Sequence, residues 1–484
     1  MKSIIEAIYN HSTTTPNKVC LIDKNEAITY GDFWTRIINL SSYFKGIGIC
    51  EGTCVILEND QSIKTLNAIF SLQLLKAISV PVENKCGVEK MESFASRCNS
   101  ELVISDNENV RMKRISYKEI EQASQEHAMI DYEFPNEDDV CEILFSTGTT
   151  GKEKGIVLTN KNNVALAQNV MDGVKMEEDN IEMIPSPLNH SHGLRRTYAN
   201  LYRGSTVVLE DGVMNVKKLF ADLRDYQVNA MDLVPAALSV LLKMSKDRFA
   251  EFDSQLRYIQ FGASPLMKSD KDKIKSLLPN VNLYNFYGST ESGCTCIYNF
   301  NVENEKQSCI GKPVINASIE ILKDNVIIDS NKNHTGQLIC KGNMNMLKYL
   351  NDEEETNKVC WNDYFVTNDE AFIDEDGDII LLGRMNDVIN VGGNKVSPEE
   401  IEDVVRGFQG IINCACVPEK HPVLGQIPKL IIQTENNKEI DKKELLLYIS
   451  NKVEPYKVPK NIEYIEKIPV SFNGKIQRSK LINK

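Results

Sequence analysis

The segment Cys54–Val82, "CVILENDQSIKTLNAIFSLQLLKAISVPV", alternates between strand-like and helix-like stretches and determines the expected fold class. Its first residues, Cys54–Asp60, have the pattern of a buried strand. A helix-like stretch, Ile63–Lys76, follows, and "ISVPV" (Ile78–Val82) is again strand-like. Strand, helix and strand in this order are typical of layered α/β structure with largely parallel sheets. The same alternation continues through "STVVLE" (Ser205–Glu210), "VPAALSVLLKM" (Val234–Met244) and "LRYIQFG" (Leu256–Gly262).

Toward the C-terminus the pattern changes, which indicates further subdomains. From about Gly336 short strands and tight turns dominate, as in "DEDGDIILLG" (Asp374–Gly383). The last hundred residues predict a small α+β unit, with a helix that begins at an N-cap Ser397 and has a capping box completed by Glu400. We place the main boundary near Gly383–Asp387.

We therefore expect an α/β protein of two domains. Residues 1–384 form a large N-terminal domain of layered α/β subdomains with a β-rich subdomain. Residues 385–484 form a small, mobile α+β domain. A chain of 484 residues is long enough for about three domain-sized units.

Composition and charge restrict the class of protein. The hydrophobic fraction of 42% and charged fraction of 25% are ordinary for a soluble globular chain. A formal net charge of −13 argues against nucleic acid as the main partner. Thirteen cysteines without zinc-site spacing indicate buried, reduced thiols rather than a metal or disulfide framework.

No segment has the pattern of a membrane span or a signal peptide. The most apolar stretch, Leu66–Val82, contains Asn67, Gln73 and Lys76. The N-terminal "MKSIIEAIYNHS" is interrupted by Glu6 and resembles an amphipathic helix. We expect a soluble, cytoplasmic protein.

The loop "STGTTGKEKG" (Ser146–Gly155) joins two strand-like stretches and is rich in small, hydroxylated and cationic residues. Backbone N–H groups around glycines, together with Ser and Thr hydroxyls, form a concavity that binds anions. Lys152 and Lys154 add positive charge, so a polyphosphate is the expected ligand. The spacing is not that of a Walker A loop. The alternative is a plain Gly/Thr-rich hairpin.

Three later segments add candidate groups. "YGSTESG" (Tyr287–Gly293) combines an aromatic ring, hydroxyls and the carboxylate of Glu291 in a short turn. An arginine and a double glycine lie in Gly383–Glu402, and Lys475 lies on a glycine-containing loop in Ile468–Leu481. Each segment alone is weak evidence.

Taken together and in this order, these segments resemble the superfamily of adenylate-forming enzymes, which includes acyl- and aryl-CoA synthetases, peptide-synthetase adenylation domains and beetle luciferases. The resemblance covers essentially the whole chain and is strongest to stand-alone AMP-forming acyl-CoA ligases. Further matching segments are "SPLNHSHGL" (Ser186–Leu194), "FGASPL" (Phe261–Leu266), "GKPV" (Gly311–Val314), "FVTNDEA" (Phe365–Ala371) and "PYKVPK" (Pro455–Lys460).

The resemblance implies a two-step reaction with ATP, Mg²⁺ and coenzyme A. A carboxylate attacks the α-phosphorus of ATP and expels pyrophosphate, and a thiol then displaces AMP from the acyl adenylate. The small domain turns between the two steps. Because the carboxylate is itself the nucleophile, the protein needs to position the reactants and neutralise charge rather than supply a nucleophile.

The resemblance also implies the roles of individual residues. Lys475 would bridge the substrate carboxylate and the α-phosphate, Thr290 would contact the α-phosphate, Glu291 would hold the magnesium, and Asp369 would bind the ribose. The implied ATP- and AMP-binding residues are Ser146, Thr147, Gly148, Thr149, Thr150, Gly151, Lys154, Gly262, Ala263, Ser264, Asn285, Phe286, Tyr287, Gly288, Thr290, Asp369 and Arg384.

The acyl pocket would be lined by His190, which is also a catalytic candidate, and by His192, Gly288 and Cys294. The segment has no carboxylate where amino-acid-activating relatives have one, so an α-amino acid is disfavoured. Arg195 and Arg196 either bind the anionic tail of a dicarboxylate or lie on a solvated helix face. We favour the solvated face, and with it an aliphatic or aromatic monocarboxylic acid.

For the thiol-accepting step the resemblance implies Asn390, Gly392, Gly393 and Lys395, with Asn386 at the hinge. Coenzyme A is the expected acceptor, since no carrier domain follows the final catalytic segment. One alternative is loading of the pantetheine arm of a separate carrier protein. Another is a non-catalytic sensor of nucleotide or acyl adenylate.

Three positions depart from the family pattern. Glu153 replaces a proline, Asn368 replaces a glycine, and Asn386 replaces a charged hinge residue. None of the three removes a group that the chemistry requires.

Overall fold

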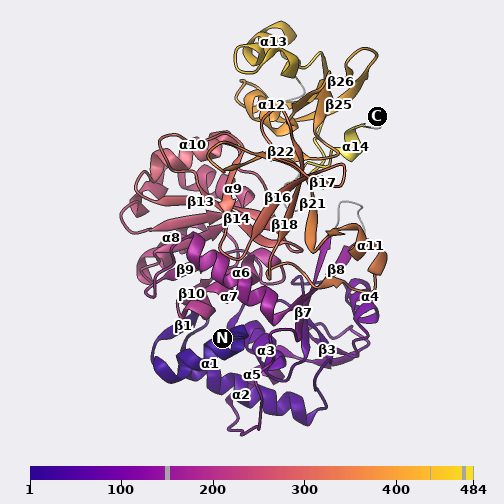
Figure 1. Ribbon diagram of the computed structural model, residues 1–484. Coiled ribbons are helices and arrows are strands. Elements are labelled where there is room, and N and C mark those ends of the chain that lie inside the picture. The colour runs from indigo at the N-terminus through magenta and orange to yellow at the C-terminus, as the bar shows by residue number, and fades with distance from the viewer. Residues whose placement is uncertain (148–152, 436–437, 471–475, 483–484) are drawn as a thin grey trace.

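The computed structural model describes residues 1–147, 153–435, 438–470 and 476–482. Figure 1 shows a large body formed by the N-terminal part of the chain and a smaller unit on top of it, formed by the last residues. The strands form three sheets, two in the large body and one in the small unit. This is the α/β architecture that the sequence predicts, so the expected fold class is confirmed.

The first sheet has the strand order β19-β8-β7-β4-β3-β5-β6. Its central strands are parallel, and β7 and β8 form an antiparallel hairpin. The strands are β3 (Cys54–Glu58), β4 (Ile78–Val82), β5 (Leu102–Ile104), β6 (Lys113–Ile115), β7 (Val140–Thr147), β8 (Glu153–Thr159) and β19 (Lys348–Tyr349). Its accompanying helices, together with the N-terminal helix, are α1 (Ile4–Thr14), α2 (Tyr30–Gly46), α3 (Ile63–Leu74), α4 (Val88–Cys98) and α5 (Tyr117–Gln125).

The second sheet has two parts: its earlier strands in the sequence are mainly parallel, and its later strands are antiparallel. Its order is β17-β16-β18-β21-β22-β15-β14-β13-β12-β11-β9-β10-β1-β2, with β20 paired to β21. The mainly parallel part comprises β1 (Val19–Ile22), β2 (Ala27–Thr29), β9 (Ile181–Ile184), β10 (Thr206–Leu209), β11 (Ala230–Leu233), β12 (Tyr258–Phe261) and β13 (Asn282–Ser289). The antiparallel part comprises β14 (Gly293–Asn299), β15 (Cys309–Pro313), β16 (Ser318–Lys323), β17 (Val326–Ile327), β18 (Gly336–Lys341), β20 (Cys360–Trp361), β21 (Tyr364–Ile373) and β22 (Ile379–Arg384).

Two helices connect these sheets. Helix α6 (Asn160–Gly173) contacts β8 of the first sheet and β14 of the second, and α7 (Ser191–Arg203) packs on α6, β9 and β10. Because α7 has neighbours on nearly every side, most of its residues are buried, polar ones included. The remaining helices of the large body are α8 (Val216–Asp225), α9 (Pro235–Ser245), α10 (Lys268–Leu277), α11 (Glu353–Lys358) and the 3₁₀ turn Lys246–Phe252.

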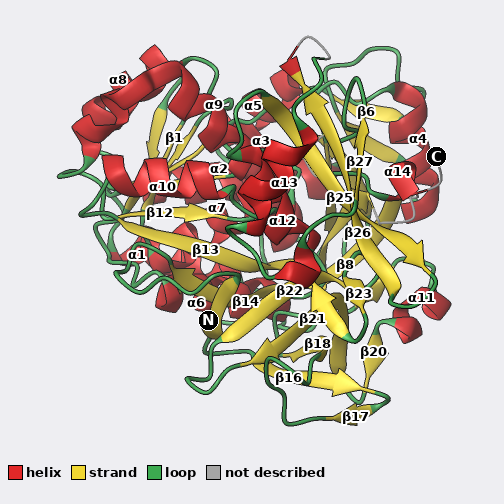
Figure 2. Cartoon of the chain, turned by 90° about the horizontal axis from the view of Figure 1, so that it is seen from above, coloured by secondary structure: helices red, strands yellow, loops and turns green. Residues whose placement is uncertain are grey.

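The third sheet belongs to the small unit. Figure 2 shows α12 and α13 beside β25 and β26, and α12 packs directly on β25. The elements are β23 (Ile389–Val391), β24 (Asn394–Val396), β25 (Ile411–His421), β26 (Gly425–Thr434), β27 (Asn461–Tyr464), α12 (Pro398–Arg406), α13 (Lys442–Ser450), α14 (Ser479–Ile482) and the 3₁₀ turn Pro455–Lys457.

The helix expected after Ser397 is present, but its capping box is not. The Ser397 side chain accepts no capping hydrogen bond from the first turn. Glu400 instead forms an ion pair with Lys457, with 2.7 Å between Oε1 and Nζ. The Glu400 carboxylate, which the predicted capping box would have used, is therefore bound by the ammonium of Lys457, a residue distant in sequence.

The cysteines lie mostly in the interior of the protein. All thirteen are free and ten are buried, while Cys54 is half-buried and Cys50 and Cys360 are exposed. Across the described residues, we find no helix that is both long and apolar enough to cross a membrane.

Candidate active site

The β7–β8 hairpin presents the ends of the predicted phosphate loop. Ser146 pairs with Lys154 across the hairpin. Lys154 Nζ lies 2.5 Å from Glu355 Oε2 and 4.7 Å from the ring centroid of Tyr349. Of the other predicted loop residues, Thr147 is described by its backbone as the last residue of β7, whereas Gly148, Thr149, Thr150 and Gly151 lie outside the described residues.

Glu291, the predicted magnesium ligand, lies close to this hairpin. The Tyr349 hydroxyl donates a hydrogen bond of 3.1 Å to Glu291 Oε1, and the backbone N–H of Met346 donates to the Glu291 carbonyl at 2.7 Å. Tyr349 therefore contacts both Lys154 and Glu291. The structure brings Lys154, at the described end of the predicted phosphate loop, and the predicted metal ligand Glu291 to the same tyrosine, although many residues separate them in sequence.

Arg195 lies beneath the adjacent turn. Its Nη1 donates a 3.3 Å hydrogen bond to the carbonyl of Thr290, and the residue is 2% exposed. Burial lowers the pKa of Arg195, and the nearby carboxylate of Glu142 opposes this shift. Arg196 is also buried, so the expected solvated helix face for these two arginines is wrong. The reason is that α7 lies between other elements rather than on the surface.

The predicted ribose-binding group is assembled from three strands. Asp369 on β21 accepts a hydrogen bond from the Tyr287 hydroxyl of β13, and its Oδ1 lies 3.1 Å from Arg384 Nε on β22. Burial and the charge of Asp369 raise the pKa of Tyr287 well above its usual value, so the phenol stays a donor. Each carboxylate oxygen keeps a second lone pair that can accept from a ribose hydroxyl.

One predicted adenine segment follows β12, and the other lies within its parallel neighbour β13. Gly262, Ala263 and Ser264 follow β12, and Asn285 of β13 pairs with the last residue of β12. Ala263 has φ +69°, a left-handed conformation that is uncommon for alanine. Such strained residues cluster at functional sites.

At Gly288 a side chain is sterically excluded. Its φ is +159°, and an added Cβ would lie 1.8 Å from the carbonyl oxygen of Gly293. This close approach allows the turn that carries Thr290 and Glu291 to fold back on β14.

His190 and His192 occupy the start of α7. His190 is the N-cap residue, and burial lowers its pKa, which favours the neutral imidazole. His192 packs against Gly262, where an added Cβ would lie 2.6 Å from its Cε1. Its Nε2 lies 2.7 Å from Asp232 Oδ1.

Asp232 is a site residue that the sequence reasoning missed. It is fully buried on β11, and its Oδ2 accepts a 2.7 Å hydrogen bond from Ser186 Oγ. Burial acts to raise its pKa, but the charge and hydrogen bond of His192, the charge of Arg196 and the hydrogen bond from Ser186 outweigh that effect and lower it. The signal in the sequence was an aspartate inside the apolar strand "AMDL" (Ala230–Leu233).

The residues predicted for the thiol-accepting step lie on the β23–β24 hairpin of the small unit. Gly392 and Gly393 both have positive φ, and the Gly393 N–H donates to Asn390 Oδ1 at 2.9 Å. Lys395 reaches the large body, with its Nζ 3.3 Å from Glu370 Oε2. Glu370 is the neighbour of Asp369, so this hairpin lies close to the predicted ribose site.

Between the two bodies, Arg384 closes a short turn. Its carbonyl accepts from the N–H groups of Asp387 and Val388, and Asn386, the predicted hinge residue, lies within this turn. Lys475 lies outside the described residues. Three residues later Arg478 is buried, with Nη2 2.8 Å from Glu402 Oε1 and Nη1 3.5 Å from Asp387 Oδ2.

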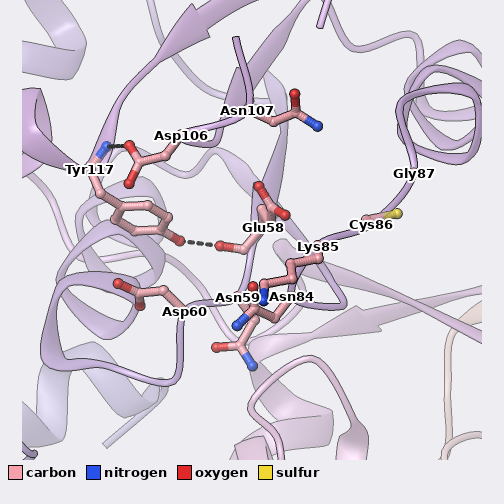
Figure 3. A pocket seen from close by; sticks show the side chains of 10 residues that line it. All are labelled: Glu58, Asn59, Asp60, Asn84, Lys85, Cys86, Gly87, Asp106, Asn107 and Tyr117. Carbon is pink, nitrogen blue, oxygen red and sulfur yellow. Dashed lines mark hydrogen bonds between the residues drawn. The ribbon is translucent and has the colours of Figure 1, made fainter. Parts of the chain in front are cut away.

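A separate polar cavity of about 410 Å³ lies at the carboxyl ends of β3 and β5. Figure 3 shows the Tyr117 hydroxyl donating to the Glu58 carbonyl at its wall. The predicted site residues do not line it. It is lined by Glu58, Asn59, Asp60, Asn84, Lys85, Cys86, Gly87, Asp106, Asn107 and Tyr117.

One acidic cluster surrounds the ammonium group of a lysine. Asp374, Asp376 and Asp378 lie close enough together to hold a cation. The ammonium of Lys306 contacts all three carboxylates, at 2.7, 2.7 and 2.6 Å. The cluster therefore serves as an ion-pair network at the β21–β22 turn.

Glu182 is a further buried carboxylate near α7. It accepts hydrogen bonds from Asn200 Nδ2 at 2.7 Å, the Tyr258 hydroxyl at 3.2 Å and Gln260 Nε2 at 3.1 Å. Burial raises its pKa to about 7, although the hydrogen bond from Asn200 and the charge of Arg196 act to lower it.

This raised pKa predicts a pH-dependent stability. Between the ordinary pKa of 4.5 and about 7, the folded protein keeps the proton on Glu182 that the unfolded chain loses. The free energy of unfolding therefore falls as pH rises through this window. Between about pH 5 and pH 8 we expect the wild type to lose about 1–3 kcal/mol more than Glu182→Gln in urea unfolding. The exposed Glu177→Gln is the control, and parallel profiles for wild type and Glu182→Gln would contradict the prediction.

Comparisons with known proteins give a consistent result. The family model described as AMP-binding enzyme matches residues 8–350, and the model described as AMP-binding enzyme C-terminal domain matches residues 400–475. The chain is 26% identical over 502 residues to 4-coumarate-CoA ligase 1 of Narcissus pseudonarcissus, covering 96% of this chain and 90% of that protein. It is 31% identical over 348 residues to 2-succinylbenzoate–CoA ligase of Staphylococcus aureus, covering 72% of this chain and 67% of that protein.

Two solved structures share the fold. The o-succinylbenzoate CoA synthetase (MenE) of Bacillus subtilis, in complex with its acyl-adenylate intermediate, superposes with a TM-score of 0.85 at 20% identity. The ATP-bound MatB of Rhodopseudomonas palustris superposes with a TM-score of 0.87 at 18% identity. In each comparison 99% of this chain and 98% of the other are covered.

Proposed function

Because the chain belongs to the AMP-binding enzyme family, we propose that it is an AMP-forming carboxylate–CoA ligase. It activates a carboxylic acid with ATP as an acyl adenylate and transfers the acyl group to coenzyme A. The relatives named above, 4-coumarate-CoA ligase and 2-succinylbenzoate–CoA ligase, support this activity.

The observation that carries the proposal is the convergence of Lys154 and Glu291 on Tyr349. Lys154 supplies a positive charge beside the phosphate loop, and Glu291 supplies a carboxylate within reach of the same phosphates. Arg195 donates a hydrogen bond to the carbonyl of Thr290 and so fixes the turn that contains Thr290 and Glu291. This arrangement positions the α-phosphorus of a bound nucleotide and stabilises the charge that develops there.

The residues present fit a magnesium ion at Glu291. Among the described residues, Oε1 of Glu291 accepts the hydrogen bond from Tyr349 and no hydrogen bond occupies Oε2. A free carboxylate oxygen is the kind of ligand that Mg²⁺ prefers, usually alongside water and phosphate oxygens. When bound, the ion neutralises charge on the phosphates. Tyr349 orients the carboxylate that would hold it.

The substrate acid carries its own nucleophile, so the protein needs no serine or cysteine at the reaction centre. Neutral His190 borders the acid, and Asp369, Tyr287 and Arg384 hold the ribose. The Asn390–Lys395 hairpin then borders the path of the pantetheine arm, and rotation about Asn386 exchanges it with the segment that carries Lys475. Both the CoA step and this rotation rest on the family resemblance.

The test is a panel of carboxylic acids with ATP and Mg²⁺, scored for AMP and pyrophosphate with and without CoA. We expect at least one acid to give CoA-dependent AMP formation and an acyl-CoA product. Thioester formation on purified carrier proteins but not on CoA would instead favour the carrier-loading alternative. ATP binding without turnover of any acid would favour the non-catalytic sensor.

A further inference from the structure

Arg196 is buried on α7, one turn after His192, and 4% of the residue is exposed. Its guanidinium carbon lies 3.4 Å from the ring centroid of Phe286 on β13, close enough for a cation–π contact. Its Nε lies 3.6 Å from Asp232 Oδ1 on β11. The guanidinium is thus held between α7 and two strands of the second sheet.

One end of this guanidinium, Nη1, is fully buried and lacks a hydrogen-bond partner among the described residues. Asp232 forms an ion pair with Arg196 but no hydrogen bond, since its Oδ1 lies 3.6 Å from Nε and its Oδ2 accepts from Ser186. Within the part of the chain that the structure describes, Asp232 Oδ1 also has no well-aligned hydrogen-bond donor, although His192 Nε2 lies 2.7 Å away. Buried charged donors are normally hydrogen-bonded, since leaving one unmatched is costly. Arg196 therefore has donors available for a ligand.

The position of these donors identifies the ligand's site. His192, which is predicted to line the acyl pocket, lies close to the guanidinium, because His192 and Arg196 both approach Asp232 Oδ1. Phe286, beneath the guanidinium, belongs to the strand that leads to Thr290 and Glu291. If the reacting carboxylate of the acid lies toward Thr290, as the proposed function requires, a group that reaches Arg196 is the far end of that acid.

We infer that Arg196 binds a second carboxylate at the far end of the substrate, so that this ligase prefers a dicarboxylic acid. The inference rests on the proposed function and narrows its substrate class. A guanidinium is suited to this role because it stays charged and its fork of N–H groups matches the geometry of a carboxylate. The relatives do not decide between a monocarboxylic and a dicarboxylic substrate, since 4-coumarate has one carboxylate and 2-succinylbenzoate has two.

The test compares kcat/KM for AMP formation between pairs of acids. Each dicarboxylic acid of a chain-length series, together with 2-succinylbenzoate, is paired with the analogue that has a methyl or a hydroxymethyl group in place of the distal carboxylate. We expect the wild type to prefer the best dicarboxylic acid by about 100-fold or more, because an analogue without the carboxylate leaves the buried Nη1 donor of Arg196 without an acceptor. In Arg196→Gln we expect this ratio to fall to within about fivefold of unity.

The ratio is insensitive to partial unfolding, because both acids are measured on the same enzyme sample. Arg196→Lys keeps the charge and should retain more of the preference than Arg196→Gln. Arg203→Gln, at the half-buried C-terminal end of the same helix, is the matched control and should keep the wild-type ratio. ATP binding, measured separately by calorimetry, should be the same in all four proteins.

The outcomes separate this inference from the proposed function. Equal use of an acid and its methyl or hydroxymethyl analogue by the wild type would overturn the dicarboxylate preference while the ligase activity stands. A preference that persists unchanged in Arg196→Gln would overturn the role of Arg196. Absence of AMP formation with every acid would overturn the proposed function itself, and the inference with it.

Discussion

Replacing Lys475 by alanine is expected to slow formation of the acyl adenylate by a few hundred-fold. A positioned ammonium between the attacking carboxylate and the α-phosphate stabilises charge that exists only in the transition state. Removing one such contact costs about 3–4 kcal/mol. The measurement is pyrophosphate release with the preferred acid in the absence of CoA.

The second half-reaction should be spared in the same variant. The family resemblance implies that the small domain rotates and carries Lys475 away before the thiol attacks. Thiolysis of a supplied acyl adenylate by CoA should therefore stay near the wild-type rate. Lys480→Ala, an exposed lysine of the same C-terminal segment, is the control. An equal loss in both half-reactions of a folded Lys475→Ala protein would refute the assigned role.

Replacing Arg478 by methionine is expected to destabilise the small unit by about 3–5 kcal/mol. Arg478 is 4% exposed, and its Nη2 lies 2.8 and 2.9 Å from the two carboxylate oxygens of Glu402, which is itself buried. Glu399 and Asp387 also lie within 3.5 Å of the guanidinium. Removing the arginine leaves a buried carboxylate without its main partner, which costs more than an exposed ion pair contributes.

Hydrogen exchange of the β25 and β26 amides measures this effect locally, and urea unfolding measures it globally. Arg406→Met is the matched control, because Arg406 contacts the same Glu402 at 3.4 Å but is more exposed. The loss of stability in Arg406→Met should be clearly smaller than in Arg478→Met. A change of less than about 1 kcal/mol in Arg478→Met would show that the cluster does not stabilise the unit.

Arg478 also links stability to the reaction cycle. It lies three residues after Lys475 and contacts Asp387, which follows the predicted hinge residue Asn386. The cluster around Glu402 thus connects the C-terminal segment to the turn at the domain boundary. The boundary itself, at residues 384 and 385, stays a prediction, as do the individual roles of the site residues.

Much of the candidate site follows from the sequence because phosphate-binding and catalytic motifs are local. Thr290 and Glu291 share one turn, and Ser146 and Lys154 bracket one hairpin, so short segments already contain the required groups. The family and the fold class were predicted from such segments and are confirmed. Tyr349 and Asp232 were missed, because neither lies in a segment with a recognisable motif.

The sequence by itself determined the family and the α/β fold class, since these depend on local patterns and motif order. Only the tertiary structure decided the environment of Arg195 and Arg196. Sequence spacing places both residues on a helix, but it does not say what covers each face of that helix. Because α7 is enclosed by α6, β9 and β10, two arginines expected in water are buried beside Thr290 and Asp232, where charge has its largest effect.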